Sequence, residues 1–248
     1  MLIAIANQKG GVAKTTSTIC LGGLLAKSGK CLVIDLDPQG NLTTGLGIEI
    51  EDNQPTVYEV ITERMTAQQV IIETPSGVDL LPADITLAKG EPEIATKVGN
   101  FYLLRDALVP VREQYQHILI DCPPSLGLLT VNALSAADAV LIPVQCQFFA
   151  LKGLAALMET IQSVQKRLNP NLSILGVLPT MAEMKTVMTQ DVLASLNSKL
   201  KGVKVFDAVP KSVKFAESNV AGQPIHLYTQ DPKLSKPYVS ISKVVQGK

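Results

Sequence analysis

The chain has 248 residues, of which 46% are hydrophobic and 4% aromatic, and its 22 basic residues balance 22 acidic ones. This length is sufficient to bury a sizeable core, and the neutral total argues against a generally basic protein that coats nucleic acid. No apolar run approaches the ~18–20 residues of a membrane-spanning helix and the first residues carry no basic segment, so we expect neither an integral membrane protein nor a signal peptide.

Short runs that are apolar at every residue alternate along the chain with longer segments of helical period. The apolar runs are residues 2–6, 31–36, 78–82, 117–121, 139–144, 174–178 and 203–209. The helical segments are residues 14–28, 58–63, 102–114, 126–136, 151–168 and 189–200. We expect residues 45–55 to form a surface loop and the tail after Pro224 to pack at the end of the fold.

Strands that are apolar on both faces belong in a sheet that is covered on both sides, which is typical of parallel sheets. The alternation of strands and helices therefore predicts an α/β fold: a doubly wound, mainly parallel sheet with right-handed crossovers and helices on both faces. No internal repeat and no long linker divides the chain. We expect residues 1–248 to form a single domain.

The segment between the first predicted strand and the first predicted helix has the composition and position of a phosphate-binding loop. It reads Asn-Gln-Lys-Gly-Gly-Val-Ala-Lys-Thr-Thr over residues 7–16. Glycines allow successive backbone N–H groups to turn toward an anion. In such a loop, Lys14 would reach the β- and γ-phosphates of a nucleotide, and the Thr15 hydroxyl would be a ligand of Mg²⁺.

The loop departs from the usual pattern G-x-x-x-x-G-K-[ST] at Gln8 and at Ala13, but it matches the deviant form K-G-G-x-G-K-[ST] through Lys9. Ala13 takes the place of a glycine directly before the second lysine. An alanine costs little there if its φ is negative. At positive φ it costs roughly 1 kcal/mol and could distort the ring of N–H groups.

Four segments, which together extend over nearly the whole chain, resemble the ParA/Soj family of partition ATPases. They are residues 7–16, Val-Ile-Asp-Leu-Asp-Pro-Gln-Gly-Asn at 33–41, Ile-Leu-Ile-Asp-Cys-Pro-Pro-Ser-Leu-Gly at 118–127, and Val-Pro-Lys-Ser-Val-Lys-Phe-Ala-Glu at 209–217. The resemblance implies a P-loop ATPase that binds ATP and Mg²⁺, hydrolyses ATP slowly and forms an ATP-dependent homodimer. Because the chain begins on the first strand, we do not expect the N-terminal helix-turn-helix domain that some family members carry.

The resemblance also implies roles for two aspartates that end apolar strands. Asp37 would help to position the attacking water and the Mg²⁺ shell, and Asp121, at the Walker B position, would hold Mg²⁺ through water. A carboxylate buried without a partner is costly, which supports a functional interpretation of both. For Asp35, a structural role and a supporting role in the site both stay open.

The expected site residues follow from these motifs. Lys9, Lys14 and Asp37 are the expected catalytic residues, and Thr15, Asp37 and Asp121 are expected around the metal. The expected nucleotide contacts are Lys9, Gly10, Gly11, Val12, Ala13, Lys14, Thr15, Thr16, Lys152, Met181 and Pro210.

Two lysines are candidates for a contact across a dimer. Since Lys14 already occupies the phosphate charge site within its own chain, we expect Lys9 to cross to the nucleotide of a partner copy. Lys152 stands where partition proteins commonly carry glutamate. It is either a solvated helix residue or a second lysine that serves the sandwiched nucleotide, as in the branch of the family that positions carboxysomes.

Basic residues gather toward the end of the sequence. From Lys185 to Lys248 there are 10 lysines, no arginine and 4 acidic residues, a net charge of +6, which leaves −6 for the rest of the neutral chain. The resemblance places DNA contacts at Lys185, Lys211 and Lys214, where lysine keeps the charge of the family's arginine without its bidentate geometry. We therefore expect DNA binding without sequence preference by the ATP dimer on the nucleoid in the cytoplasm, and an adaptor protein on the cargo that stimulates hydrolysis.

Two other classes of protein fit less well. A MinD-like, membrane-cycling regulator of the division site needs a C-terminal amphipathic helix with bulky apolar anchors, whereas residues 238–248 contain no Phe, Trp or Leu. We therefore expect no membrane partner. A nitrogenase-type iron protein needs paired cysteines, and the four cysteines here are dispersed, as expected for reduced thiols. His117 and His226 have no spacing typical of a metal site.

The sequence leaves the cargo open between plasmid, chromosome and carboxysome, with Lys152 favouring the last.

Overall fold

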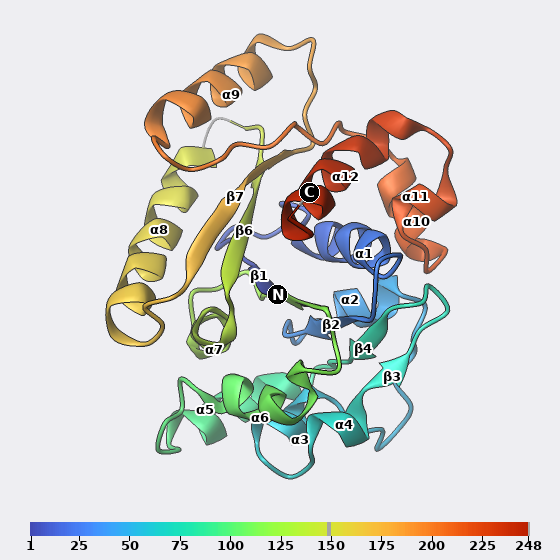
Figure 1. The fold of residues 1–248 in the computed structure, drawn as a ribbon, viewed down its shortest axis with the longest axis vertical. Helices are drawn as coiled ribbons and strands as arrows, with labels where there is room; N and C mark the ends of the chain where they lie inside the picture. Colours follow the sequence, from blue (N-terminus) through green and yellow to red (C-terminus); the bar gives the residue numbers. More distant parts are fainter. Residues whose placement is uncertain (148–149, 248) are drawn as a thin grey trace.

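The computed structural model describes residues 1–147 and 150–247, except for the side chains of residues 150–152. Within them, seven strands form one sheet in the order β3-β4-β2-β5-β1-β6-β7 (Figure 1). The strands are β1 (Leu2–Ile5), β2 (Cys31–Asp35), β3 (Ile72–Glu73), β4 (Asp79–Leu81), β5 (His117–Asp121), β6 (Ala139–Gln145) and β7 (Ser173–Thr180). In this described sheet β3 runs antiparallel to β4 and the other neighbouring pairs are parallel. The predicted mainly parallel sheet is confirmed.

Helices connect the strands and cover the sheet on both faces (Figure 1). In the first half of the chain they are α1 (Lys14–Leu25), α2 (Asn41–Gly45), α3 (Val57–Ile61), α4 (Ala67–Val70), α5 (Leu87–Ala95) and α6 (Leu103–Arg112). In the second half they are α7 (Leu128–Ala136), α8 (Ala150–Arg167), α9 (Val187–Lys199), α10 (Lys214–Val220), α11 (Ile225–Tyr228) and α12 (Pro232–Val245).

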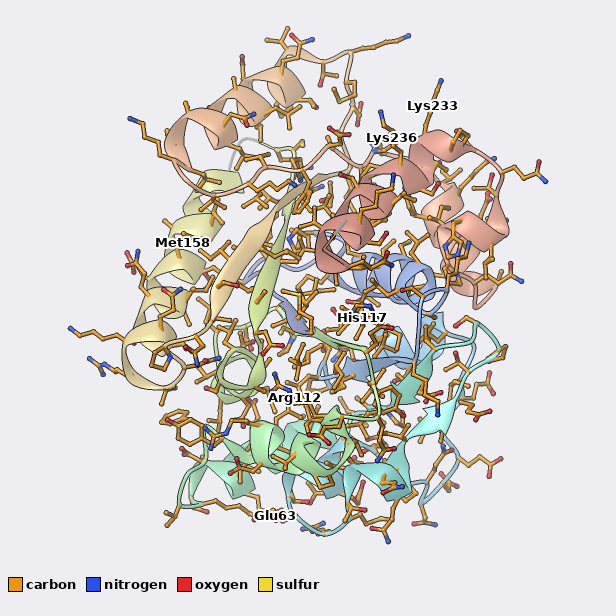
Figure 2. All side chains as sticks on the ribbon, viewed as in Figure 1. Glu63, Arg112, His117, Met158, Lys233 and Lys236 are labelled. Atoms are coloured by element: carbon orange, nitrogen blue, oxygen red, sulfur yellow. The ribbon has the colours of Figure 1, made fainter. Side chains whose placement is uncertain are left out.

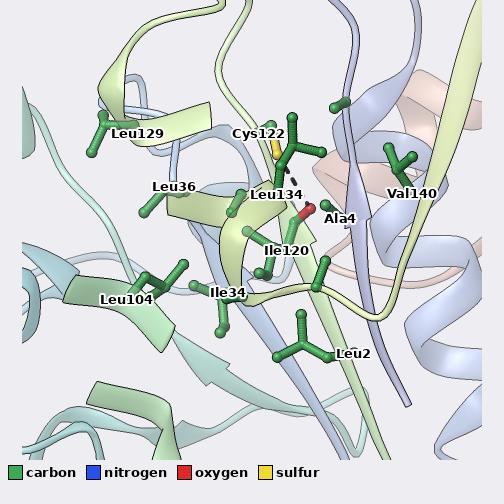
Figure 3. Close-up of a cluster of buried hydrophobic side chains, with 14 of the residues drawn as sticks. Leu2, Ala4, Ile34, Leu36, Leu104, Ile120, Cys122, Leu129, Leu134 and Val140 are labelled. Atoms are coloured by element: carbon green, nitrogen blue, oxygen red, sulfur yellow. Dashed lines mark hydrogen bonds between the residues drawn. The ribbon is translucent and has the colours of Figure 1, made fainter. Parts of the chain in front are cut away.

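The apolar strands supply two separate cores, one on each face of the sheet, because successive side chains of a strand point to opposite faces. In β1, Ile3 and Ile5 pack with α1, α2, α11 and α12. Leu2 and Ala4 of the same strand pack with α3 through α9, and Figure 3 shows the centre of this second cluster. Each large side chain buried in this way contributes roughly 1.5–3 kcal/mol to stability.

The helix that follows the first strand lies unusually close to the sheet. A Cβ atom added to Gly22 of α1 would lie 2.9 Å from Cγ1 of Val33 in β2, so only glycine permits this approach. The outer side of α1 is covered in turn by α12, whose Leu234, Tyr238 and Ile241 are buried in the same core. As a result, α1 is held between the sheet and the end of the chain.

The strand register places Asp121, a predicted site residue, beside Asp35, whose role the sequence left open. In the parallel pair β2–β5, Asp35 is the register partner of Asp121, and Ile5 of β1 is the register partner of Asp121 on its other side. The loops that follow β1, β2 and β5 therefore leave the sheet at one edge. This is the edge at which ligands bind in doubly wound folds.

One expectation about the fold is wrong. Residues 203–209 do not form a strand; Val205 makes only an isolated bridge to Val177. After Gly45, which ends α2, residues 46–55 form neither helix nor strand, as expected for a loop, and the tail after Pro224 packs against α1 through α11 and α12. The short elements β3, α2, α4, α5 and α10 were not predicted.

Candidate functional site

A cavity of about 800 Å³ opens at this edge of the sheet, between the loop over residues 7–16 and helices α2 and α10. Most of the expected loop residues line it. The lining residues are Gly10, Gly11, Ala13, Lys14, Thr15, Thr16, Asp37, Gln39, Asn41, Thr44, Gly45, Gly47, Ile48, Glu49, Pro124, Met181, Asn219 and Val220.

Two residues of the loop have left-handed backbone conformations. Gly11 has φ +68° with open space around the position of a Cβ, so the backbone rather than crowding favours glycine there. Ala13 has φ 66° and ψ 36° and is the N-cap residue of α1. Ala13 therefore adopts the positive φ at which an alanine is the more costly residue.

The first turn of α1 points into the cavity. Its N-cap residue, Ala13, supplies no side-chain acceptor for the backbone N–H groups of this turn. Such uncapped N–H groups, together with the positive end of the helix dipole, favour an anion. A phosphate group fits this position.

Lys14 is the cation inside the cavity. It is only 7% exposed, and its Nζ lies 3.4 Å from the backbone oxygen of Lys9. Burial lowers the pKa of Lys14, while the nearby Asp121 acts in the opposite direction. A buried ammonium is costly without an anion, and a bound phosphate would supply one.

Thr15 and Asp121 form the candidate metal position. The Thr15 hydroxyl donates to Oδ2 of Asp121 at 2.6 Å. Within the described part of the chain, Oδ1 of this fully buried carboxyl has no hydrogen-bond partner. Burial raises the pKa of Asp121 well above its usual range, and the charge of Asp35 adds to this effect. A bound cation would satisfy the orphaned oxygen and restore the carboxylate.

These residues fit Mg²⁺ rather than a metal held by protein alone. Among the residues that the structure describes, no group of three or more His, Cys, Asp or Glu side chains could hold a metal ion. Mg²⁺ is usually bound through one or two carboxylates together with substrate phosphates and water. Thr15, Asp37 and Asp121 around a phosphate site meet that requirement.

Asp35 and Asp37 have different surroundings. Asp35 is fully buried and accepts hydrogen bonds from the backbone and hydroxyl of Thr43 and from the backbone of Asp37. Burial raises its pKa to about 7, against the effect of the Thr43 hydrogen bonds. Asp37 lines the cavity, and its Oδ1 accepts from the backbone N–H of Gln39 at 3.0 Å. Through these hydrogen bonds Asp35 fixes the turn that carries Asp37.

Lys9 lies at the rim and is not among the lining residues. Its Nζ donates to Oε1 of Gln145 at 2.9 Å and to Oε1 of Gln147 at 3.1 Å. The ammonium is therefore held by neutral amides of its own protomer, on the side of β6.

The remaining nucleotide candidates divide between those that line the cavity and those that do not. Met181, with φ 52°, and Thr16 line it. Val12 is buried behind the loop, where its carbonyl accepts from the hydroxyl of Thr180. Pro210 is outside the lining, in an isolated bridge with Ala182.

The sequence motifs missed the wall opposite the loop. Ile48, Glu49 and Val220 line the cavity, and Asn219 donates to the Thr16 hydroxyl at 3.3 Å. Within the described residues, Oδ1 of Asn219 has no partner and is buried. These residues belong to the expected surface loop and to α10, and no local pattern marks them as binding residues.

Lys152 belongs to α8, and its side chain lies outside the described residues. The three lysines expected to bind DNA are exposed. Lys211 pairs with Glu183 at 2.7 Å, and Nζ of Lys214 donates to the hydroxyl of Thr229 at 3.2 Å.

Further lysines lie near this group. Thr229, the partner of Lys214, precedes α12, whose first turns carry the exposed Lys233 and Lys236. Figure 2 shows these two side chains extending outward at the top of the view. The motif comparison did not single them out, although they belong to the basic end of the sequence.

None of the cysteines or histidines lines the cavity. Cys20, Cys31, Cys122 and Cys146 are buried free thiols, and burial raises the pKa of each. Burial lowers the pKa of His226 to about 4 and also lowers that of His117. No described helix combines the length and the apolar character needed to cross a bilayer.

Comparisons with known proteins agree with this geometry. The family model described as "AAA domain" matches residues 1–174. The sporulation initiation inhibitor protein Soj of Bacillus subtilis is 42% identical over 246 residues, which cover 98% of this chain and 97% of Soj. The chromosome partitioning protein ParA of Caulobacter vibrioides is 44% identical over 249 aligned positions, with 98% of this chain and 93% of ParA covered.

Solved structures that share the fold include complexes of other proteins with nucleotides. The ATP complex of a McdA variant from Cyanothece superimposes with a TM-score of 0.93 at 28% identity and covers 99% of this chain and 96% of its own. Cobyrinic acid a,c-diamide synthase of Mycobacterium smegmatis with a bound ATP analogue and magnesium has a TM-score of 0.85 at 34% identity, with 99% and 93% covered.

Proposed function

The chain belongs to the ParA/Soj family of partition ATPases, and on this basis we propose that it is an ATP-driven switch that positions or segregates cargo on the nucleoid. In this proposal, residues 1–248 act as one ATPase domain in the cytoplasm. ATP drives two copies together, the dimer binds DNA without sequence preference, and an adaptor protein on the cargo stimulates slow hydrolysis. The observation that carries the proposal is the cavity in which Lys14, the first turn of α1 and the orphaned oxygen of Asp121 converge.

In the ATP-bound protein, we assign the phosphates to the loop. The N–H groups from Gly10 to Thr16 and the ammonium of Lys14 bind them, which offsets phosphate charge in a water-poor site. Mg²⁺, when bound, supplies positive charge against the β- and γ-phosphates. Thr15 and Asp121 orient its shell, and Asp37 orients the attacking water. The adenine base of ATP lies toward Met181 and toward the wall formed by Ile48, Asn219 and Val220.

Lys9 is the residue assigned to the partner's nucleotide. It lies at the rim rather than in its own cavity, and Lys14 already occupies the phosphate charge site. A cation supplied from the other copy makes dimerisation depend on the γ-phosphate, which is the logic of an arginine finger. Lys152 is the alternative candidate for this contact.

The names of the relatives favour the chromosome as the cargo. Both curated relatives at 42–44% identity act in chromosome partitioning or sporulation by name, whereas McdA shares 28%. We therefore propose the chromosome ahead of a plasmid or carboxysome. A membrane-cycling MinD-like role is disfavoured, because the apolar side of α12, with Leu234, Tyr238 and Ile241, is buried against α1.

One experiment tests the proposal as a whole. Wild-type protein and Lys14→Ala are compared for nucleotide binding, for sedimentation as a dimer with ATP or ADP, and for retention on unrelated DNA fragments. We expect wild type to dimerise and bind DNA with ATP only, and the variant to lose nucleotide binding with both later steps. A wild-type protein that stays monomeric with ATP, or DNA retention that ignores nucleotide, would reject the proposal.

A further inference from the structure

The two glutamines that contact Lys9 come from a single short stretch of chain. Gln145 is the last residue of β6, and Gln147 follows two residues later with its backbone N–H on the carbonyl of Gln145 at 2.8 Å. Both side-chain oxygens accept from the same ammonium. The two amides therefore form one binding position for a cation.

The backbone at Lys9 is fixed next to this position. Its N–H donates to Oδ1 of Asn7 at 3.0 Å, and the buried Asn7 donates to the carbonyl of Pro143 in β6 at 2.6 Å. Because the loop is tied to the same strand that carries Gln145, the side chain of Lys9 can exchange positions while its backbone stays in place. Rotation of the Lys9 side chain is therefore sufficient to move its ammonium from the two glutamines to a position that points outward.

The chemistry of this contact makes it weak and reversible. None of the ion pairs within the described residues involves Lys9. An amide oxygen attracts the ammonium through its dipole, whereas a carboxylate or phosphate oxygen also carries an opposite charge and therefore holds the ammonium more strongly. The triphosphate of a second copy would therefore displace the two glutamines from Lys9. It would displace a glutamate at one of these positions far less readily.

We propose that Gln145 and Gln147 are positioning residues for Lys9: they hold its ammonium at the rim of its own protomer until a second ATP-loaded copy presents phosphates, and so set the ATP concentration at which the chain dimerises. This inference rests on the proposed function, in which Lys9 acts across the dimer. Gln147 is the better residue to vary, because it is exposed and is not among the residues that line the nucleotide cavity.

The test is a titration of dimer formation with the slowly hydrolysed analogue ATPγS, followed by sedimentation velocity. Gln147→Glu should raise the ATPγS concentration at which half of the protein is dimeric by about threefold to fivefold. This increase should shrink at high salt, because the new contact between Lys9 and the glutamate is an exposed ion pair. Gln147→Ala should lower it about twofold, because one of the competing acceptors is lost. The affinity of the monomer for ADP should stay the same in both variants.

Gln114 provides the matched control, since it is an exposed glutamine at the end of α6 that contacts only the carbonyl of Pro110 in the described structure. Gln114→Glu and Gln114→Ala should leave the titration unchanged. The inference is overturned if the two Gln147 variants shift the concentration in the same direction or not at all, or if ADP affinity changes with them. Wild-type protein that fails to dimerise with ATPγS would instead reject the proposed function, and this inference with it.

Discussion

The ammonium of Lys211 lies 2.7 Å from Oε1 of Glu183, so a lysine assigned to DNA already has an anionic partner within the protein. Both side chains are more than half exposed, and such surface pairs contribute about 0–1 kcal/mol. The pair therefore does not block DNA binding. It lowers the net charge that this part of the surface offers to a phosphate.

The first prediction concerns the DNA surface. Joint replacement of Lys185, Lys211 and Lys214 by alanine should abolish ATP-dependent DNA retention, whereas Glu183→Gln should strengthen it, because the latter releases Lys211. Each phosphate contact contributes about −0.9 to the slope of log affinity against log salt, so loss of these lysines should also flatten that slope. Filter retention of unrelated DNA over a range of salt concentrations measures both effects.

The control for this experiment removes the same charge elsewhere. Lys30, Lys89 and Lys166 are exposed and lie outside the assigned surface, and their joint replacement by alanine should leave DNA retention and its salt slope unaltered. If the assigned lysines behave like these controls at normal ATP binding, they serve only to solvate the surface.

The second prediction separates ATP binding from dimerisation. Lys9→Ala should bind ATP, because Lys9 is not among the lining residues, and should lose the ATP-dependent dimer in sedimentation. Lys152→Ala tests the alternative lysine. Normal dimerisation of the Lys9 variant would shift the role to Lys152, and the double variant would then be informative, since groups that serve one phosphate are not additive.

The third prediction separates ATP binding from hydrolysis. Asp37→Ala should bind ATP and Mg²⁺ with the phosphate loop intact but release no phosphate above background. The neighbouring Asp35→Asn should keep part of the hydrolysis, because Asp35 supports the turn from behind and lies outside the cavity lining. Phosphate release and nucleotide affinity are measured on both variants. Hydrolysis by Asp37→Ala at the wild-type rate would remove Asp37 from the catalytic group.

The fourth prediction concerns the strain in the loop. Because Ala13 has φ 66°, its replacement by glycine should relieve roughly 1 kcal/mol of backbone strain. The greater freedom of glycine in the unfolded chain offsets part of this, so Ala13→Gly should increase the free energy of unfolding by about 0.5 kcal/mol. The melting temperature should rise by about 1–2 °C. Gly11→Ala, at φ +68° with open space around it, should lower it instead. A lower melting temperature for Ala13→Gly would contradict this account.

The fifth prediction concerns acid stability. Both ring nitrogens of His226 are buried without a partner in the described structure, and burial, with a contribution from Lys27, lowers its pKa to about 4. An unfolded histidine takes up its proton near pH 6.5, so between these values the unfolded chain binds more protons. The free energy of unfolding should therefore fall as pH drops from about 6.5 to about 4.

His226→Gln removes this titrating group while other ionisable side chains stay the same. Thermal unfolding of both proteins from about pH 7 to about pH 4.5 should show a shallower loss of stability for the variant. Parallel curves for the two proteins would show that His226 makes no such contribution.

The parts of the fold that the sequence predicted are those in which local pattern and final environment agree. Residues 118–120 are apolar between His117 and Asp121, and the predicted run 117–121 forms the central strand β5 with the predicted bounds. Residues 203–209 also contain several apolar residues, but their backbone reaches β7 only through separate hydrogen bonds, such as Phe206 N–H to the carbonyl of Val177 and Val209 N–H to the carbonyl of Pro179. They run beside the edge strand without forming a strand of their own. Whether an apolar run becomes a strand depends on which strand lies beside it in the fold, and the local sequence does not specify that neighbour.

The same contrast holds for the site. The loop residues and Asp37 were predictable because phosphate and Mg²⁺ demand particular groups at fixed spacing. Asn219 and Ile48 reach the cavity because α2 packs on α1 and α10 packs on α2, and no local pattern encodes this packing. In α12, Pro237 lies inside a helix that its sequence does not favour; the buried face around Tyr238 compensates for the hydrogen bond that proline cannot make.

The packing of α12 on α1 has a consequence for how the protein is made. The first helix carries Ile19, Leu21 and Leu25 into a core that Leu234, Tyr238 and Ile241 complete. During synthesis, the phosphate loop leaves the ribosome long before the segment that covers its helix, and contacts so distant in sequence form late. We infer that a nascent chain cannot bury the outer side of α1 until α12 has emerged, and that truncation before α12 leaves an apolar surface for chaperones and proteases to recognise.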